Sequence, residues 1–133
     1  MKVLFSIKPE FVAKIEAGTK KYEYRKILFK NTNVSHVVIY ATRPIGRIIG
    51  EFEVSKILSD DPQKLWARTK THSGVSYDFY QQYFSGCDLG FALEINNLRI
   101  YKKNIDPFKT LPSFTPPQSF CYVKNDSPLQ NLH

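Results

Sequence analysis

Charged side chains are closely spaced between Gly18 and Arg25, where the sequence is GTKKYEYR. The glycine follows a helical pattern and an alternating segment leaves it, so Glu23 and Arg25 stand on one face of a strand. Lys20, at the start of that strand, can bind a phosphate or a carbonyl oxygen. Glu23 can accept a hydrogen bond from an amine, and Arg25 supplies a planar fork of donors. Beside a cleft the three would form a binding site, whereas in open solvent they would be ordinary edge-strand charges.

Three other segments can contribute to the same cleft. In Thr42-Arg43-Pro44, Arg43 follows a buried strand and can reach a phosphate, although an exposed loop arginine has the same pattern. His72-Ser73-Gly74 precedes an aromatic helix, at whose start Tyr77 can stack on a base or belong to the core. In Pro116 to Phe120, rigid prolines frame two polar residues, as they also would in a tail that covers a sheet edge.

Metal and nucleotide-cofactor chemistry have little support in the sequence. The three histidines and two cysteines (His36, His72, His133, Cys87 and Cys121) share no metal-ligand spacing. Glycine-rich phosphate-binding patterns are absent. A Cys–His nucleophile would require Cys121 and His72 to meet in space, and two ordinary thiols are the simpler expectation. We therefore predict no metal and no cofactor.

The elements that must position these residues follow from periodicity and capping. Alternating or β-branched residues predict strands at 2–8, 21–25, 36–41, 46–58 and 89–101, with Gly50 at a bulge or a close backbone approach. Proline and capping residues predict short helices near 9–17, 62–70 and 76–85. Helices do not follow every strand, so we predict an α+β fold with a small mixed sheet curling toward a barrel.

The length of 133 residues is typical of one compact domain. We expect this domain over residues 1–105. Five prolines and no regular period follow from Asp106 onward, so residues 106–133 are expected to be an extended tail, packed on the domain or partly disordered. No apolar run approaches the roughly 18 residues of a membrane span, and two cysteines without a CxxC pair favour the reducing cytoplasm.

The net charge of +7 is unevenly distributed along the chain. Residues 1–50 contain ten Lys and Arg against three Glu, whereas residues 51–133 contain nine basic and nine acidic residues. A one-sided basic excess favours a polyanionic partner such as nucleic acid. A solvated basic face on an ordinary domain would give the same count.

Gly18, Lys20, Glu23 and Arg25 match G-x-K-x-x-E-x-R, the signature of the ASCH domain, and the preceding VLFSIKPEFVAKIEAG is also typical of that family. From Met1 to about Tyr101 the chain resembles the ASCH family of the PUA-like superfamily. It is most similar to the small prokaryotic and phage forms often called predicted transcriptional regulators. The resemblance implies a PUA-like β-barrel with a cleft beside the signature, in which relatives bind RNA or modified nucleobases.

We therefore expect an RNA- or nucleobase-binding domain, with Lys20, Glu23 and Arg25 in the cleft and with Arg43 and Tyr77 as further ligand contacts. The alternative is a hydrolase, either a ribonuclease or an amidohydrolase on a modified nucleoside, that uses Lys20 and Glu23. ASCH relatives that resemble amidohydrolases use a Thr where this chain has Glu23, and a Glu near the position of Ser73. That departure weakens the amidohydrolase interpretation. A third reading is a protein-interaction module whose basic face binds an acidic partner.

Overall fold

A single curled sheet of six strands organises the chain, in the order β2-β5-β4-β3-β1-β6. The computed structural model describes residues 1–132. Its strands are β1 (Lys2–Ile7), β2 (Tyr22–Arg25), β3 (His36–Ala41), β4 (Arg47–Asp60), β5 (Gly90–Ile105) and β6 (Phe120–Tyr122). β1 and β3 are parallel and the other neighbouring strands are antiparallel. The sheet forms a half-barrel, so the predicted α+β fold with a mixed, curling sheet is confirmed.

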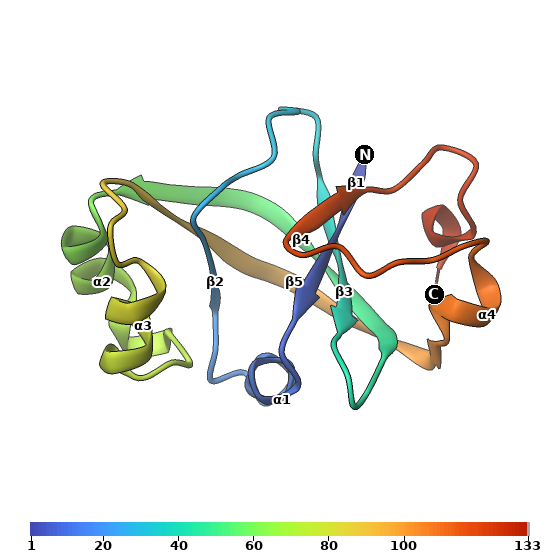
Figure 1. Cartoon of the computed structure of the whole chain (residues 1–133), viewed down its shortest axis with the longest axis horizontal. Helices are drawn as coiled ribbons and strands as arrows, with labels where there is room; N and C mark the ends of the chain where they lie inside the picture. The colour runs from blue at the N-terminus through green and yellow to red at the C-terminus, as the bar shows by residue number, and fades with distance from the viewer. Residues whose placement is uncertain (133) are drawn as a thin grey trace.

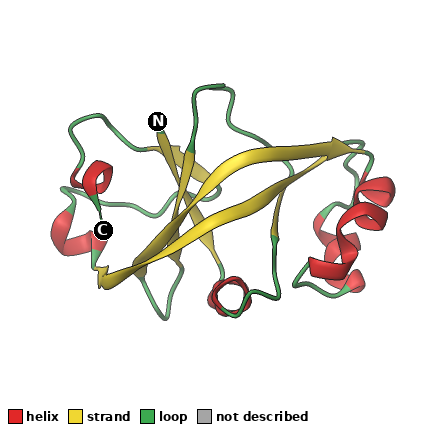
Figure 2. Ribbon diagram, turned by 180° about the vertical axis from the view of Figure 1, so that it is seen from behind, coloured by secondary structure: helices red, strands yellow, loops and turns green. Residues whose placement is uncertain are grey.

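The long strands β4 and β5 lie side by side across the molecule (Figure 2). Their register is irregular at several points, one of them at Gly50. A Cβ atom on Gly50 would lie 2.5 Å from the carbonyl oxygen of Arg99, which confirms the close backbone approach predicted there. Such irregularities bend and twist a strand pair, and here they accompany the curl of the sheet.

Short helices cover the ends and one side of the sheet. They are α1 (Pro9–Glu16), α2 (Pro62–Thr69), α3 (Tyr77–Tyr83) and α4 (Pro107–Thr110), with 3₁₀ turns at Lys70–His72 and Pro128–Asn131. The first three confirm the predicted helices, and the side chains of Asp61 and Ser76 cap α2 and α3 as expected. Figure 1 shows α2 and α3 together at one end of the molecule and α4 at the other. No helix within residues 1–132 is long and apolar enough to span a bilayer.

The hydrophobic core lies on both faces of β1 and β3. On one face, Val37 and Ile39 of β3 pack in the same cluster as Val12 and Ile15 of α1. On the other face, Val38 belongs to a second cluster with residues of the C-terminal segment. A third cluster joins α2 and α3 to β2. The strand that holds the candidate site is therefore anchored from one side by packed aromatic residues.

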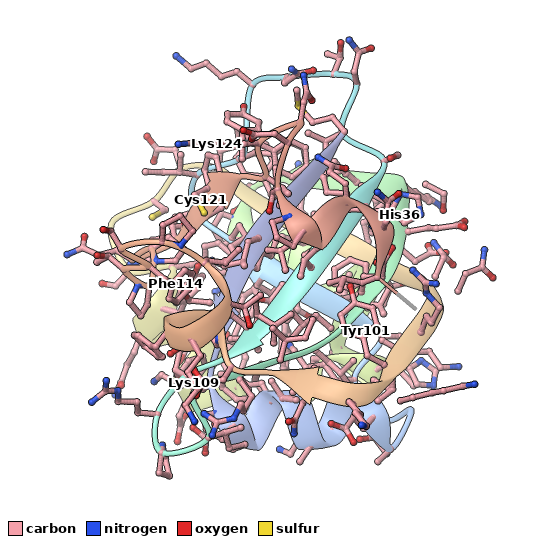
Figure 3. All side chains as sticks on the ribbon, turned by 90° about the vertical axis from the view of Figure 1, so that its right-hand side faces the viewer. His36, Tyr101, Lys109, Phe114, Cys121 and Lys124 are labelled. Carbon is pink, nitrogen blue, oxygen red and sulfur yellow. The ribbon has the colours of Figure 1, made fainter. Side chains whose placement is uncertain are left out.

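The C-terminal segment is more regular than its composition predicts. Residues 107–132 contain α4, β6 and a 3₁₀ turn, whereas the composition predicted an extended tail, packed on the domain or partly disordered. The reason is tertiary: β6 pairs with β1, while Val123 and Leu129 are buried in the second cluster. Figure 3 views this end, with Phe114 and Cys121 on the segment that covers the strands. Position 133, the last of the predicted extension, lies outside the described residues.

Candidate functional site

Lys20 is a buried lysine held by the turn between α1 and β2. The helix α1 ends at Glu16, and Gly18 follows its C-cap with a φ of +80°. The Lys20 residue is only 2% exposed, and its Nζ donates a hydrogen bond to the carbonyl oxygen of Ser73 at 2.7 Å. Nζ also lies 5.3 Å from the ring centroid of Phe11 and 5.0 Å from that of Tyr24. The ammonium is thus surrounded by aromatic rings and one carbonyl group.

Burial changes the titration of this lysine. Desolvation lowers the pKa of Lys20 to about 8, Glu23 partly opposes the shift, and the positive charges of Lys14 and Arg25 add to it. At pH 7 roughly one molecule in ten therefore carries a neutral amine at this position. A neutral amine can accept a proton or attack a carbonyl carbon, which an ammonium cannot do.

The loop at residues 72–74 positions Lys20. Its three successive carbonyl oxygens accept hydrogen bonds from the Lys21 amide at 2.9 Å, from Lys20 Nζ at 2.7 Å and from Lys14 Nζ at 3.1 Å. Gly74 has a φ of +68°, and a Cβ atom there would lie 2.5 Å from the Cβ of Lys20. A side chain at Gly74 would therefore displace the Lys20 stem, which explains why a glycine occupies this position.

Glu23 and Arg25 form a buried ion pair on the face of β2 opposite its aromatic anchor. Arg25 Nη2 donates to Glu23 Oε2 at 2.7 Å, and each residue is 6% exposed. Arg25 also donates to the carbonyl oxygens of Ser6 at 3.1 Å and Ser119 at 3.0 Å, and its guanidinium lies 4.1 Å from the ring centroid of Phe5. Within residues 1–132, Glu23 Oε1 forms no hydrogen bond, and Arg25 Nε is buried without a partner.

Arg25 bridges the open seam of the half-barrel. Its own strand, β2, is one edge of the sheet, whereas its partners are Ser6 on β1 and Ser119, which directly precedes the opposite edge strand β6. A cavity of about 790 Å³ lies along this seam. Five segments line it: 6–8 with Phe11, Lys20 with 23–27, Thr42, Val75 with residues 79, 80, 82 and 83, and 116–119. The Glu23–Arg25 pair on the cavity floor is therefore held by hydrogen bonds from both sides of the seam.

Aromatic rings and two exposed lysines line the mouth of the cavity. Phe79 and Tyr83, one turn apart on α3, have nearly parallel rings at an interplanar angle of 12°. Lys8 Nζ lies 5.2 Å from the Phe79 centroid, and Lys26 Nζ lies 4.8 Å from the Tyr83 centroid. The cavity thus combines a buried charged floor, aromatic surfaces for stacking and exposed positive charge at its entrance.

Comparison with known proteins identifies the family. The family model of the ASCH domain matches residues 5–100. The chain belongs to the ASCH family. An ASCH domain-containing ribonuclease from Zymomonas mobilis is 30% identical over 125 residues, which cover 92% of this chain and 84% of that protein.

Solved structures of ASCH from the same organism share the fold. The crystal structure of ASCH from Zymomonas mobilis superposes with a TM-score of 0.85 at 27% identity, covering 93% of this chain and 88% of the other. A Tyr-to-Phe variant of that protein gives the same TM-score at 26% identity, covering 93% of this chain and 91% of the other. Both likenesses extend past the family model, and so past residue 100 of this chain.

The structure brings the ASCH signature together but leaves two predicted ligand contacts elsewhere. Lys20, Glu23 and Arg25 share the cavity floor. Arg43 lies outside the cavity lining, with its guanidinium 5.3 Å from the ring centroid of Phe108. Tyr77 is also outside it, with its hydroxyl donating to Gln63 at 3.2 Å and its ring packed on the neighbouring tryptophan. Binding roles for Arg43 and Tyr77 remain predictions, and this geometry gives them no support.

Several lining residues were missed in the sequence. Phe79 and Tyr83 fit a helical apolar stripe, which indicates a buried face and hides their exposure to the cavity. Lys8 and Lys26 belong to no motif, although Lys8 ends one predicted strand and Lys26 follows another within the basic first fifty residues. The segment at 116–119, weighed as a cleft contact or an edge cover, does both, since it lines the cavity and leads into β6.

Proposed function

We propose that this ASCH domain binds an unpaired nucleobase of an RNA strand in the seam cavity. The observation that carries the proposal is the buried pairing of donor and acceptor groups on the cavity floor. Lys20 can donate to a base carbonyl or ring nitrogen, and the free oxygen of Glu23 can accept from a base amino or imino group. The Watson–Crick edge of every nucleobase presents such a mixture of donors and acceptors.

The walls and the mouth of the cavity support the same ligand. The parallel rings of Phe79 and Tyr83 present faces on which a base can stack. Lys8 and Lys26 can exchange their ring contacts for the phosphates that flank the bound base. The similarity to a protein named as a ribonuclease supports RNA as the polymer.

Binding of fluorescently labelled single-stranded RNA, measured by anisotropy in about 50 mM salt, tests the proposal. Glu23→Gln removes the charged acceptor at nearly constant size, and we expect affinity to fall about tenfold. Glu16→Gln removes an exposed carboxylate at the end of α1 and should leave affinity unchanged. Equal affinities for wild type, Glu23→Gln and Glu16→Gln would contradict the proposed site.

Hydrolysis of the bound RNA is the second candidate, favoured by the lowered pKa of Lys20. In this reaction the neutral amine accepts the proton of a 2′-hydroxyl group and the 2′ oxygen attacks phosphorus. The bond from phosphorus to the 5′ oxygen breaks, and that oxygen takes up a proton, which the resulting Lys20 ammonium can return. The products are a 2′,3′-cyclic phosphate and a new 5′ end. Cleavage of labelled RNA that increases with pH toward 8 and is lost in Lys20→Arg would support it. RNA that binds but stays intact would leave a binding domain.

A further inference from the structure

Lys20 is an unusual buried lysine because no carboxylate pairs with it. Buried lysines are rare unless an acid compensates their charge. Within residues 1–132, no Asp or Glu oxygen lies within 4.0 Å of Lys20 Nζ. Its one hydrogen bond is to the carbonyl oxygen of Ser73, whereas Glu23 on the same floor is paired with Arg25. The fold therefore buries a primary amine beside a cavity without neutralising it.

We propose that Lys20 Nζ forms an imine with the aldehyde of an open-chain sugar phosphate that enters the seam cavity. The aldehyde can belong to a free aldose phosphate or to an abasic nucleotide in a nucleic-acid strand. Both have the same chemistry, an electrophilic carbon at one end of a short polyol and a phosphate at the other. The inference depends on the proposed function only in using the same cavity.

The geometry suits this ligand at both ends. A desolvated amine between apolar or aromatic groups is the arrangement in which lysine acts as a nucleophile toward carbonyl groups. Lys20 lies between Phe11 and Tyr24, and the loop at 72–74 fixes its side chain. The exposed amines of Lys8 and Lys26 stand at the mouth, where they can bind the phosphate.

The reaction balances without any added reagent. The lone pair of the neutral amine attacks the aldehyde carbon, and the proton on nitrogen passes to the carbonyl oxygen to give a carbinolamine. Glu23 lines the same floor and can carry that proton. Loss of the hydroxyl group with one proton, as water, forms the carbon–nitrogen double bond. Charged or titratable groups near Lys20 are Glu23, Lys14, Arg25 and Tyr24, and only the carboxylate favours the ammonium.

Reductive trapping of the full chain tests the inference. Cyanoborohydride adds hydride to the imine carbon and leaves a stable secondary amine on the lysine. With ribose 5-phosphate as the probe, intact-protein mass spectrometry should show one dominant adduct, and peptide mapping should place it on Lys20. Lys20→Arg keeps the positive charge and should abolish this adduct, whereas Lys64→Arg, on the exposed face of α2, should retain it.

Comparison of three aldehyde probes distinguishes a free sugar phosphate from an abasic site in a strand. Trapping should be about tenfold faster with ribose 5-phosphate than with ribose, because Lys8 and Lys26 bind the phosphate. A synthetic oligonucleotide with one abasic site is the probe for a nucleic-acid source. If it traps faster than ribose 5-phosphate at equal concentration, the strand is the source, and the reverse order assigns the free sugar phosphate.

Two outcomes would overturn the inference. Adducts spread over surface lysines in wild type would show that Lys20 has no special reactivity, and this measurement does not require any variant to fold. Absence of an adduct while intact RNA still binds would refute the imine and leave the proposed function standing. An adduct on Lys20 in a protein that fails to bind intact RNA would instead support the imine and contradict the proposed function.

Discussion

Two buried glutamates lie beside cations, and their carboxylates accept very different numbers of hydrogen bonds. Glu51 of β4 is 3% exposed and accepts from Lys2 Nζ at 3.0 Å, Arg99 Nη2 at 2.9 Å and Tyr101 Oη at 2.7 Å. Glu23 is 6% exposed and accepts from Arg25 alone among the described residues. Figure 3 looks onto the end of the molecule where Tyr101 lies, away from the helices of the α2–α3 end.

The difference teaches what each cluster is for. At Glu51, burial by itself would raise the carboxyl pKa, but the hydrogen bonds from Tyr101 and Lys2 outweigh burial and hold that pKa below its usual value. Lys2 also donates to the carbonyl oxygen of Leu129 at 3.3 Å, so this cluster fastens the C-terminal segment to the sheet. A complete donor set stabilises the fold, whereas the incomplete set at Glu23 leaves capacity for a ligand.

The largest contrast is expected between Glu51→Gln and Glu23→Gln in urea unfolding. Glu51→Gln should lower the free energy of unfolding by about 3 kcal/mol, because it leaves the largely buried ammonium of Lys2 without its carboxylate. Glu23→Gln keeps an acceptor for Arg25 and should cost about 1 kcal/mol. Equal losses in the two variants would show that both clusters are structural.

Two lysine variants sharpen the same comparison. Lys2→Met breaks a partly buried ion pair and should destabilise the protein by about 2 kcal/mol. Lys20→Met removes an ammonium that no carboxylate compensates, so its free energy of unfolding should stay unchanged or rise while RNA binding falls. Thermal unfolding and anisotropy on the same samples measure both effects. A strongly destabilised Lys20→Met would mean that Lys20 is needed for folding.

The lowered pKa of Lys20 should make the free energy of unfolding depend on pH. Its pKa is about 8 in the folded protein and near its usual 10.5 when unfolded, so the unfolded chain binds more protons between these values. Stability should therefore rise by roughly 1 kcal/mol from pH 7 to pH 9, relative to Lys20→Met. Urea midpoints at each pH measure the difference. Parallel profiles for the two proteins would contradict a depressed Lys20 pKa.

Glu51 should govern the acid side of the dependence of stability on pH, whereas Lys20 governs the alkaline side. Because its folded pKa is held low, its stabilisation is present above the unfolded carboxyl pKa and is lost as the pH falls through the folded value. Glu51→Gln should therefore flatten the acid limb of the stability profile, while Glu23→Gln serves as the comparison. An acid limb that is unchanged in Glu51→Gln would remove Glu51 as its source.

The smallest expected effect concerns the mouth of the cavity. If Lys8 and Lys26 contact phosphates, each Lys→Met change should reduce the slope of log affinity against log salt by about 0.7 for single-stranded RNA. Lys102→Met, on the exposed part of β5 outside the cavity lining, is the matched control and should leave the slope unchanged. Equal slopes in all three variants would place the strand elsewhere.

Local patterns predicted the elements and the shared face of the signature. The caps at Asp61 and Ser76 and the positive φ at Gly18 depend on neighbouring residues, so they can be inferred from short segments. Glu23 and Arg25 were predicted on one face because strand alternation is also a local property, and Lys20 was placed beside them by its position at the start of the strand and by the ASCH signature. The cavity beside them could not be predicted in this way. It lies along the seam of the half-barrel, where Arg25 donates to the carbonyl oxygen of Ser119, 94 residues away in the sequence.

What the sequence could not predict depends on such distant contacts. The pairing of Phe120–Tyr122 with β1 is a tertiary event that the proline-rich composition conceals. The same holds for Glu51, whose partners Lys2 and Tyr101 are 49 and 50 residues away. Arg43 and Tyr77 were predicted as ligand contacts from residue type and from their places beside a predicted strand and helix, without a constraint on where their side chains lie.

The open half-barrel also bears on self-association. An unpaired strand edge is a template on which another chain can add a strand and begin to aggregate. Here the edge strands β2 and β6 have only four and three residues. Beyond the stretch paired with β2, the outer edge of β5 carries Asn97 with a φ of +47° and the charges of Arg99, Lys102 and Lys103. An irregular backbone and lysine side chains disfavour edge-to-edge pairing of β-strands. The half-barrel can therefore remain open without promoting association with a second copy of the chain.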